Sequence, residues 1–247
     1  MDIDIKAGTI TFRVLYHGPE GATKFLNLRG LQSSAAVCED LCVLHADGDR
    51  VMTLAMGGDE IPPLLGLRVA FDAVAAPGAT ASRAIERMLV LAADAVVFLP
   101  DRRLPAGSES RRALVRLSQG LSAAGNSAGD IPLLIQNYED ENSPLERRHL
   151  DAHTAALEPV FVSVPGDTPE AAEMVFRQAR EAVLHRVSDM GAVCGIAAAR
   201  EALARRVSDR EAALSAIAEP AEESWSTAAL WAMLGAMAAA AVVSWLL

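Results

Sequence analysis

Gly18 and Lys24 lie six residues apart, between an alternating apolar run that ends at His17 and a segment of helical character. This is the spacing of the first glycine and the lysine in the phosphate-binding pattern G-x-x-x-x-G-K-[ST]. In that pattern backbone N–H groups surround a phosphate, the lysine reaches the β and γ phosphates, and the Ser or Thr hydroxyl holds Mg²⁺. Lys24 is one of only two lysines among 247 residues. We therefore take Gly18, Gly21 and Lys24 as candidate phosphate-binding residues.

Two positions of this pattern are changed. Thr23 replaces the second glycine, and Phe25 replaces the hydroxyl residue that would hold Mg²⁺. Glu20 adds a carboxylate to a loop that would face phosphate, which is unfavourable unless a cation intervenes. The segment predicts a degenerate phosphate-binding loop without a side chain for magnesium at the usual place.

The surrounding elements have the order of an α/β domain. We expect strands at 10–17, 38–45, 50–55, 67–74, 95–99, 131–135 and 160–164, and helices at 24–31, 83–93, 109–124, 145–157 and 169–187. The short, continuously apolar runs at 95–99 and 131–135 are typical of strands buried on both faces. This order predicts a mostly parallel central sheet flanked by helices, with ligand loops at the carboxyl ends of the strands.

Further residues at the loop ends follow the order found in one known family. They are Tyr16, Gly18, Pro19, Lys24, Asn27 and Leu28, then Asp49-Arg50, Pro77-Gly78, Asp94, Val96-Val97-Phe98, Asp101 and Asn137-Tyr138-Glu139-Asp140. On these residues the chain resembles the Ras-like bacterial gliding-motility and polarity GTPases of the MglA type, over about residues 9–187. The resemblance implies a P-loop small-GTPase-like domain with GTP or GDP as its ligand. It also implies that Pro77 and Gly78 open switch II, and that the guanine-binding residues are Asn137, Asp140 and Ser163.

The residues that this family uses for hydrolysis are missing. Val51 stands where the family has the switch I threonine, and Ala79 stands where it has the glutamine that positions water. Phosphoryl transfer depends on positioning and on charge neutralisation by Mg²⁺, lysine and a water-orienting group. Since only Lys24 remains, we expect neither GTP hydrolysis nor the family's magnesium site.

Composition excludes some other classes of function. The formal net charge is −10 and the isoelectric point is near 5.0, so no basic surface is expected for nucleic acid. The chain has no GxSxG motif for a serine nucleophile. His149 and His153 are four residues apart on an expected helix, but no third metal ligand accompanies them, so we expect no metal site.

Residues 188–224 have a polar helical pattern. Ile196, Leu203 and Val207 follow a 4-3 spacing that Arg200 and Arg210 interrupt. The pattern favours a helical stalk that partly packs on the domain. A short coiled coil, through which copies of the chain would associate, is the alternative.

The segment after the stalk is apolar. No charge occurs between Ser224 and Leu247. The 21 residues 227–247, at about 1.5 Å each, are long enough to span the hydrocarbon core of a bilayer. Trp225 and Trp245 lie near its two ends, where indole rings favour the membrane interface. Residues 225–247 therefore predict a C-terminal transmembrane helix, in which small residues would allow self-association. Because residues 1–6 lack the apolar core of a signal peptide, we expect the folded part in the cytoplasm; a buried core helix is the alternative for the segment.

Three hypotheses follow. The first is a membrane-anchored, non-hydrolysing GTPase-like module that binds protein partners, such as another small GTPase or its regulator. The second is an active GTP-hydrolysing switch that uses unconventional residues or a partner's arginine. The third is a structural membrane scaffold without nucleotide.

The anchor can be tested by extraction. The full-length chain is expected to stay with membranes in alkaline carbonate, whereas a chain ending at Glu223 is released, because the apolar span is lost. Ala238→Arg should impair insertion, since an arginine at mid-span costs roughly 2.5–3.5 kcal/mol. Release of the full-length chain as readily as the shortened one would identify the segment as a packed core helix.

Overall fold

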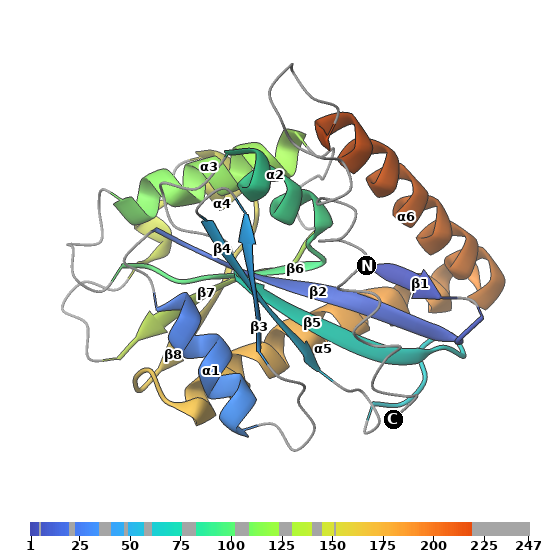
Figure 1. Ribbon diagram of the computed structural model, residues 1–247, viewed down its shortest axis with the longest axis horizontal. Helices are drawn as coiled ribbons and strands as arrows, with labels where there is room; N and C mark the ends of the chain where they lie inside the picture. The colour runs from blue at the N-terminus through green and yellow to red at the C-terminus, as the bar shows by residue number, and fades with distance from the viewer. Residues whose placement is uncertain are drawn as a thin grey trace.

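The computed structural model describes residues 1–4, 6–19, 23–34, 41–46, 49–56, 61–75, 83–101, 109–123, 130–139, 145–150 and 152–218. Eight strands form one mixed sheet with helices on both faces (Figure 1). The strands are β1 (Asp2–Asp4), β2 (Thr9–His17), β3 (Cys42–Ala46), β4 (Asp49–Met56), β5 (Arg68–Ala75), β6 (Ala95–Phe98), β7 (Leu133–Tyr138) and β8 (Val160–Val164). The helices are α1 (Lys24–Ser34), α2 (Arg83–Ala92), α3 (Glu109–Ala123), α4 (Ala152–Ala155), α5 (Pro169–Cys194) and α6 (Ile196–Ala218), with a 3-10 turn at Arg147–His149.

The strand order is β3-β4-β5-β2-β6-β7-β8, with β1 also paired to β2. The five strands from β5 to β8 in this order are parallel, and β1, β3 and β4 pair antiparallel to their neighbours. The predicted α/β fold with a mostly parallel sheet is therefore confirmed. The turn after β2 and the end of β7 lie at the same edge of the sheet, as expected from the sequence.

Alternation along the buried strands sorts side chains to the two faces of the sheet. In β2, Phe12 and Tyr16 join a core cluster with α1 and α5, whereas Leu15 joins a cluster with α2 and α3. Helices α1 and α5 approach each other closely at Gly30, where an added Cβ would lie 3.1 Å from the Cβ of Ala172. A larger residue there would force the two helices apart.

Two sequence expectations need correction. The helix expected at 145–157 is instead the 3-10 turn, an extended Leu150 and the short α4. The break allows Leu145 and Leu150, which would lie about 140° apart on one helix, to pack against the same core cluster as α3. Strand β7 also runs three residues beyond Ile135, so that Asn137 lies within the strand rather than in a loop.

The expected stalk is part of the domain. Helix α5 runs without a break through residue 187 to Cys194, and α6 turns back against α5, α2 and β1 (Figure 1). Ala199, Leu203 and Leu214 of α6 are buried. The expectation of a helix that packs on the domain is confirmed.

The two arginines that interrupt the 4-3 spacing make the polar contacts of α6. Arg200 donates to the carbonyl of Leu65 through Nε at 2.8 Å and also through Nη2. Arg210 donates to the carbonyls of Ala92 and Ala93 at the end of α2, at 3.3 and 2.8 Å. Intramolecular docking therefore explains the charged positions better than a coiled coil does.

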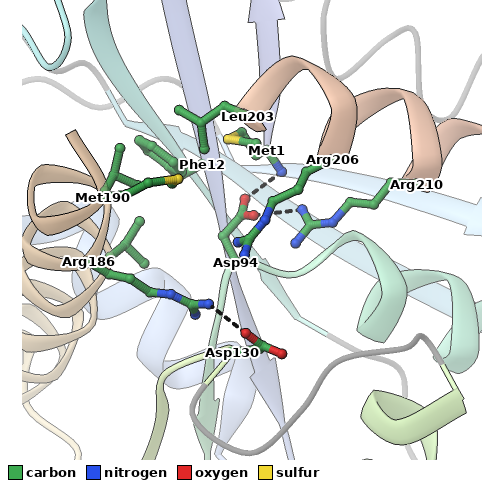
Figure 2. Close-up of a pocket in the computed structure, with 11 residues that line it drawn as sticks. Met1, Phe12, Asp94, Asp130, Arg186, Met190, Leu203, Arg206 and Arg210 are labelled. Atoms are coloured by element: carbon green, nitrogen blue, oxygen red, sulfur yellow. Dashed lines mark hydrogen bonds and ion pairs between the residues drawn. The ribbon is translucent and has the colours of Figure 1, made fainter. Parts of the chain in front are cut away.

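A small pocket lies where α5 and α6 meet the sheet (Figure 2). Its volume is about 30 Å³, and Phe12, Leu203 and Met190 are among its apolar lining residues. Its polar lining residues include Asp94 and three arginines, Arg186, Arg206 and Arg210.

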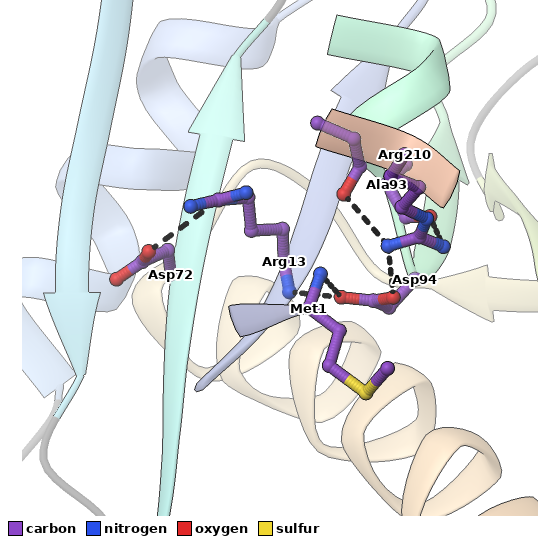
Figure 3. A network of polar contacts seen from close by, with 7 residues as sticks. Met1, Arg13, Asp72, Ala93, Asp94 and Arg210 are labelled. Atoms are coloured by element: carbon purple, nitrogen blue, oxygen red, sulfur yellow. Dashed lines mark hydrogen bonds and ion pairs between the residues drawn. The ribbon is translucent and has the colours of Figure 1, made fainter. Parts of the chain in front are cut away.

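Asp94, between α2 and β6, connects four parts of the chain (Figure 3). Its carboxylate accepts from the Arg13 backbone N–H at 2.9 Å, from the Met1 amine at 2.5 Å and from Arg210 Nη1 at 2.6 Å. Burial by itself raises the pKa of Asp94, but the charges of the amine and of Arg210 outweigh it and hold that pKa below its usual range. The carboxylate is therefore ionised, and it holds the N-terminus, β2 and α6 together at the start of β6.

Within the described ranges, no helix is both long and apolar enough for a membrane crossing. The expected anchor at 225–247 lies outside the described residues.

The docking of α6 can be tested at Arg210. Arg210→Ala should lower the free energy of unfolding by about 2–3 kcal/mol, because it removes a cation from a buried carboxylate and a donor from two carbonyls. Urea denaturation measures this loss. Arg205→Ala is the matched control: Arg205 is 70% exposed and lies 3.9 Å from Glu201, so its loss should change stability by less than about 0.5 kcal/mol. Equal effects of the two variants would contradict the docking of α6 through Arg210.

Candidate functional site

Lys24 begins α1, and its side chain turns back into the loop that precedes it. Its ammonium donates to the carbonyl of Gly18 at 2.9 Å and to that of Pro19 at 3.2 Å. The residue is only 5% exposed, so charge-assisted hydrogen bonds offset the cost of burying the cation. A positive charge is thus fixed at the carboxyl edge of the sheet.

Thr23 joins this loop to two other elements at the same edge. Its hydroxyl lies 2.6 Å from the hydroxyl of Tyr138, at the end of β7, and donates to Asp167 Oδ1, before α5, at 3.0 Å. Gln136 donates to the same Tyr138 hydroxyl at 3.2 Å. At this position, where the phosphate-binding pattern has glycine, the threonine side chain connects the loop to the rest of the domain.

Two of the guanine-binding residues implied by the resemblance, Asn137 and Ser163, lie among the described residues. Asn137 faces the side of the sheet opposite to Tyr138, and its amide donates to the carbonyl of Leu145 at 2.7 Å. Asn137 Oδ1 is buried and has no hydrogen-bond partner among the described residues. Ser163 pairs with Asn137 across β7 and β8 and is exposed.

Several other candidates cannot be placed. Gly21, Asp140, Pro77 and Gly78 lie outside the described residues. Of the expected set, the structure brings together Gly18 and Lys24, and it adds Tyr138 to them through Thr23. Tyr138 itself is buried, with 1% of its surface exposed.

Phe25 follows Lys24 at the place where the phosphate-binding pattern has a hydroxyl residue. Its ring is 42% exposed and lies under the guanidinium of Arg29, whose Cζ is 5.6 Å from the ring centroid. Val51 is buried in β4. In the part of the chain that the structure describes, no cluster of three His, Cys, Asp or Glu side chains is arranged to hold a metal ion.

His17, the last residue of β2, connects the loop to α2. Its Nε2 lies 2.7 Å from Glu86 Oε1, and Arg116 of α3 lies 3.8 Å from the same oxygen. Burial lowers the pKa of His17 against the opposing effect of Glu86, and the hydrogen bond from His17 lowers the pKa of Glu86. The pair is therefore a neutral imidazole that donates to a carboxylate.

Sequence reasoning missed His17, Glu86, Thr23 and Asp167 as members of this site. The signal available for His17 was a polar residue at the end of a buried strand, directly before the turn. Asp167 and Glu86 carried no such signal, because only the fold brings them to the loop.

Comparison of the sequence with models of protein families finds no matching family, and comparison with curated proteins finds no match either.

The buried imidazole makes stability depend on pH. The unfolded chain binds a proton at His17 near pH 6.5, whereas the folded chain, with its lowered pKa, does so only at lower pH. Acidification from pH 7 to 5 should therefore destabilise the protein, with His17 contributing up to about 1.4 kcal/mol per pH unit. Glu86 contributes to the pH dependence of stability only at pH values below its ordinary pKa of 4.5.

His17→Gln, which keeps a donor for Glu86 but does not titrate, should reduce this dependence. The remaining slope comes from the Met1 amine, whose pKa burial lowers to about 5. Urea midpoints between pH 5 and 7 measure it. His185→Gln, at a site 79% exposed, should leave the wild-type profile unchanged. An unaltered profile in His17→Gln would show that His17 is not the group responsible.

Proposed function

We propose that this protein is a membrane-tethered interaction module, built on a small-GTPase-like fold, that binds protein partners without hydrolysing GTP. The observation that carries the proposal is the contact of Lys24 with its own loop. The ammonium that would meet a phosphate is bound by the carbonyls of Gly18 and Pro19. The protein's own carbonyls therefore occupy two of the donor positions of Lys24.

The place of this loop in the sheet supports a descent from a ligand-binding domain. After β2 the chain forms β3, β4 and β5 on one side of that strand and then crosses to β6 on its other side, so the strand order reverses at β2. In open α/β sheets, ligands bind at the carboxyl edge where the order reverses. The loop between Gly18 and Lys24 follows β2 at that point.

The loss of hydrolysis follows from what surrounds the loop. The magnesium position carries the exposed ring of Phe25, and the position of the water-orienting glutamine carries Ala79. Without these groups, Lys24 alone cannot position water and neutralise the developing charge. What remains is a domain that can bind a protein partner through its surface. Such a partner would be another small GTPase or its regulator.

The contact of Thr23 with Tyr138 and Asp167 favours a constitutive module over a nucleotide-dependent one. It joins the loop after β2 to the end of β7 and to the loop before α5. A nucleotide would have to displace the loop carbonyls from Lys24 before its phosphates could bind there. The membrane tether is the segment 225–247.

The two lysines of the chain, Lys24 and Lys6, provide a test variant and its matched control. In the full-length protein, GTP hydrolysis should equal that of buffer, and fluorescent GTP and GDP should not bind at micromolar concentration, with or without Mg²⁺. Lys24→Ala should lower the free energy of unfolding by about 2 kcal/mol, because two carbonyls lose a charged donor. Lys6→Ala, at an exposed site, should change it by less than about 0.5 kcal/mol.

Two results would redirect the proposal. GTP turnover that is lost in Lys24→Ala but kept in Lys6→Ala would establish the active switch instead. Tight nucleotide binding without turnover, again lost only in Lys24→Ala, would replace the constitutive module with a nucleotide-dependent one.

A further inference from the structure

The pocket between α5 and α6 lies at the base of the sheet, away from the loop of Lys24. Arg186 projects into it from α5, and Arg206 and Arg210 project from α6 (Figure 2). Asp94 and Asp130 line the same pocket. Five charged side chains thus meet around a space of about 30 Å³.

The charges in this pocket do not balance. Arg210 Nη1 is paired with Asp94 at 2.6 Å, and Arg186 Nη2 is paired with Asp130 at 3.1 Å. The Met1 amine also contacts Asp94. Arg206 has no ion pair or hydrogen bond with any described residue, so one guanidinium is in excess.

We propose that this pocket binds a phosphate-type oxyanion between Arg186 and Arg206. The two guanidiniums come from different helices, and a tetrahedral oxyanion can accept from both because its oxygens point in several directions. A planar carboxylate instead pairs bidentately with a single guanidinium.

The electrostatics of Arg186 support this assignment. Burial lowers its pKa, and the nearby charge of Arg206 lowers it further. An anion between the two groups would replace this repulsion with two attractions. The volume admits about two water molecules, so inorganic phosphate or the terminal phosphate of a small soluble molecule fits, whereas a nucleoside does not.

Such a ligand would act on the docking of α6. Arg186 belongs to α5 and Arg206 to α6. An oxyanion that contacts both would strengthen the contact between the two helices. The inference does not depend on the proposed function, because it concerns the opposite edge of the sheet.

The test compares five proteins, the wild type and four variants, in full-length form in a neutral detergent. Sodium phosphate is titrated against sodium chloride of equal ionic strength, and Tm and the Nε–Hε NMR signals of arginine are recorded. At a phosphate concentration ten times its Kd, Tm of the wild type should rise by about 3–5 °C. The rise should persist in Arg205→Ala and in Lys24→Ala, and it should vanish in Arg206→Ala.

In chloride, Arg206→Ala should melt at or above the wild-type temperature, because it removes a like charge from the vicinity of Arg186. Arg206→Gln, which keeps the length of the side chain, should behave in the same way. A phosphate response that survives in both variants would overturn the proposal, as would a Tm in chloride more than about 2 °C below that of the wild type. Loss of the response in Lys24→Ala alone would place the anion at the loop after β2 instead.

Discussion

Asp94 carries a charge that the interior tolerates only because three donors from distant parts of the chain reach it. The Met1 amine, the backbone N–H of Arg13 and the guanidinium of Arg210 all contact its two oxygens. A buried carboxylate with fewer partners would be costly, so these contacts are interdependent. The N-terminus, β2 and α6 therefore meet at this one group, which also lines the pocket with Arg186 and Arg206.

Helix α2 connects this group with the loop at the other edge of the sheet. Near its start Glu86 binds His17, the residue that precedes Gly18. At its end the carbonyls of Ala92 and Ala93 bind Arg210, and its apolar face packs Met88 and Leu91 against Leu214 of α6. The candidate loop and the C-terminal helix therefore contact opposite ends of the same element.

The local elements could be predicted from the sequence, whereas their distant partners could not. The strand ending at His17 and the helix starting at Lys24 follow from alternation and a turn. Arg200 and Arg210 were visible only as defects in a heptad pattern, because the carbonyl of Leu65 and the carboxylate of Asp94 lie over 100 residues away in the chain. At β7 the motif suggested Asn137, but side chains alternate along a strand, and it is Tyr138 that faces the loop.

The docked α6 also sets how far the domain can stand from a bilayer that holds residues 225–247, as proposed. A free helix of its 23 residues would add about 34 Å of reach. Since α6 lies on the domain instead, only residues 219–224 separate it from the anchor, a path of roughly 20 Å at full extension. A tether this short confines the domain to a thin layer at the membrane surface and raises its effective concentration toward partners in the same layer.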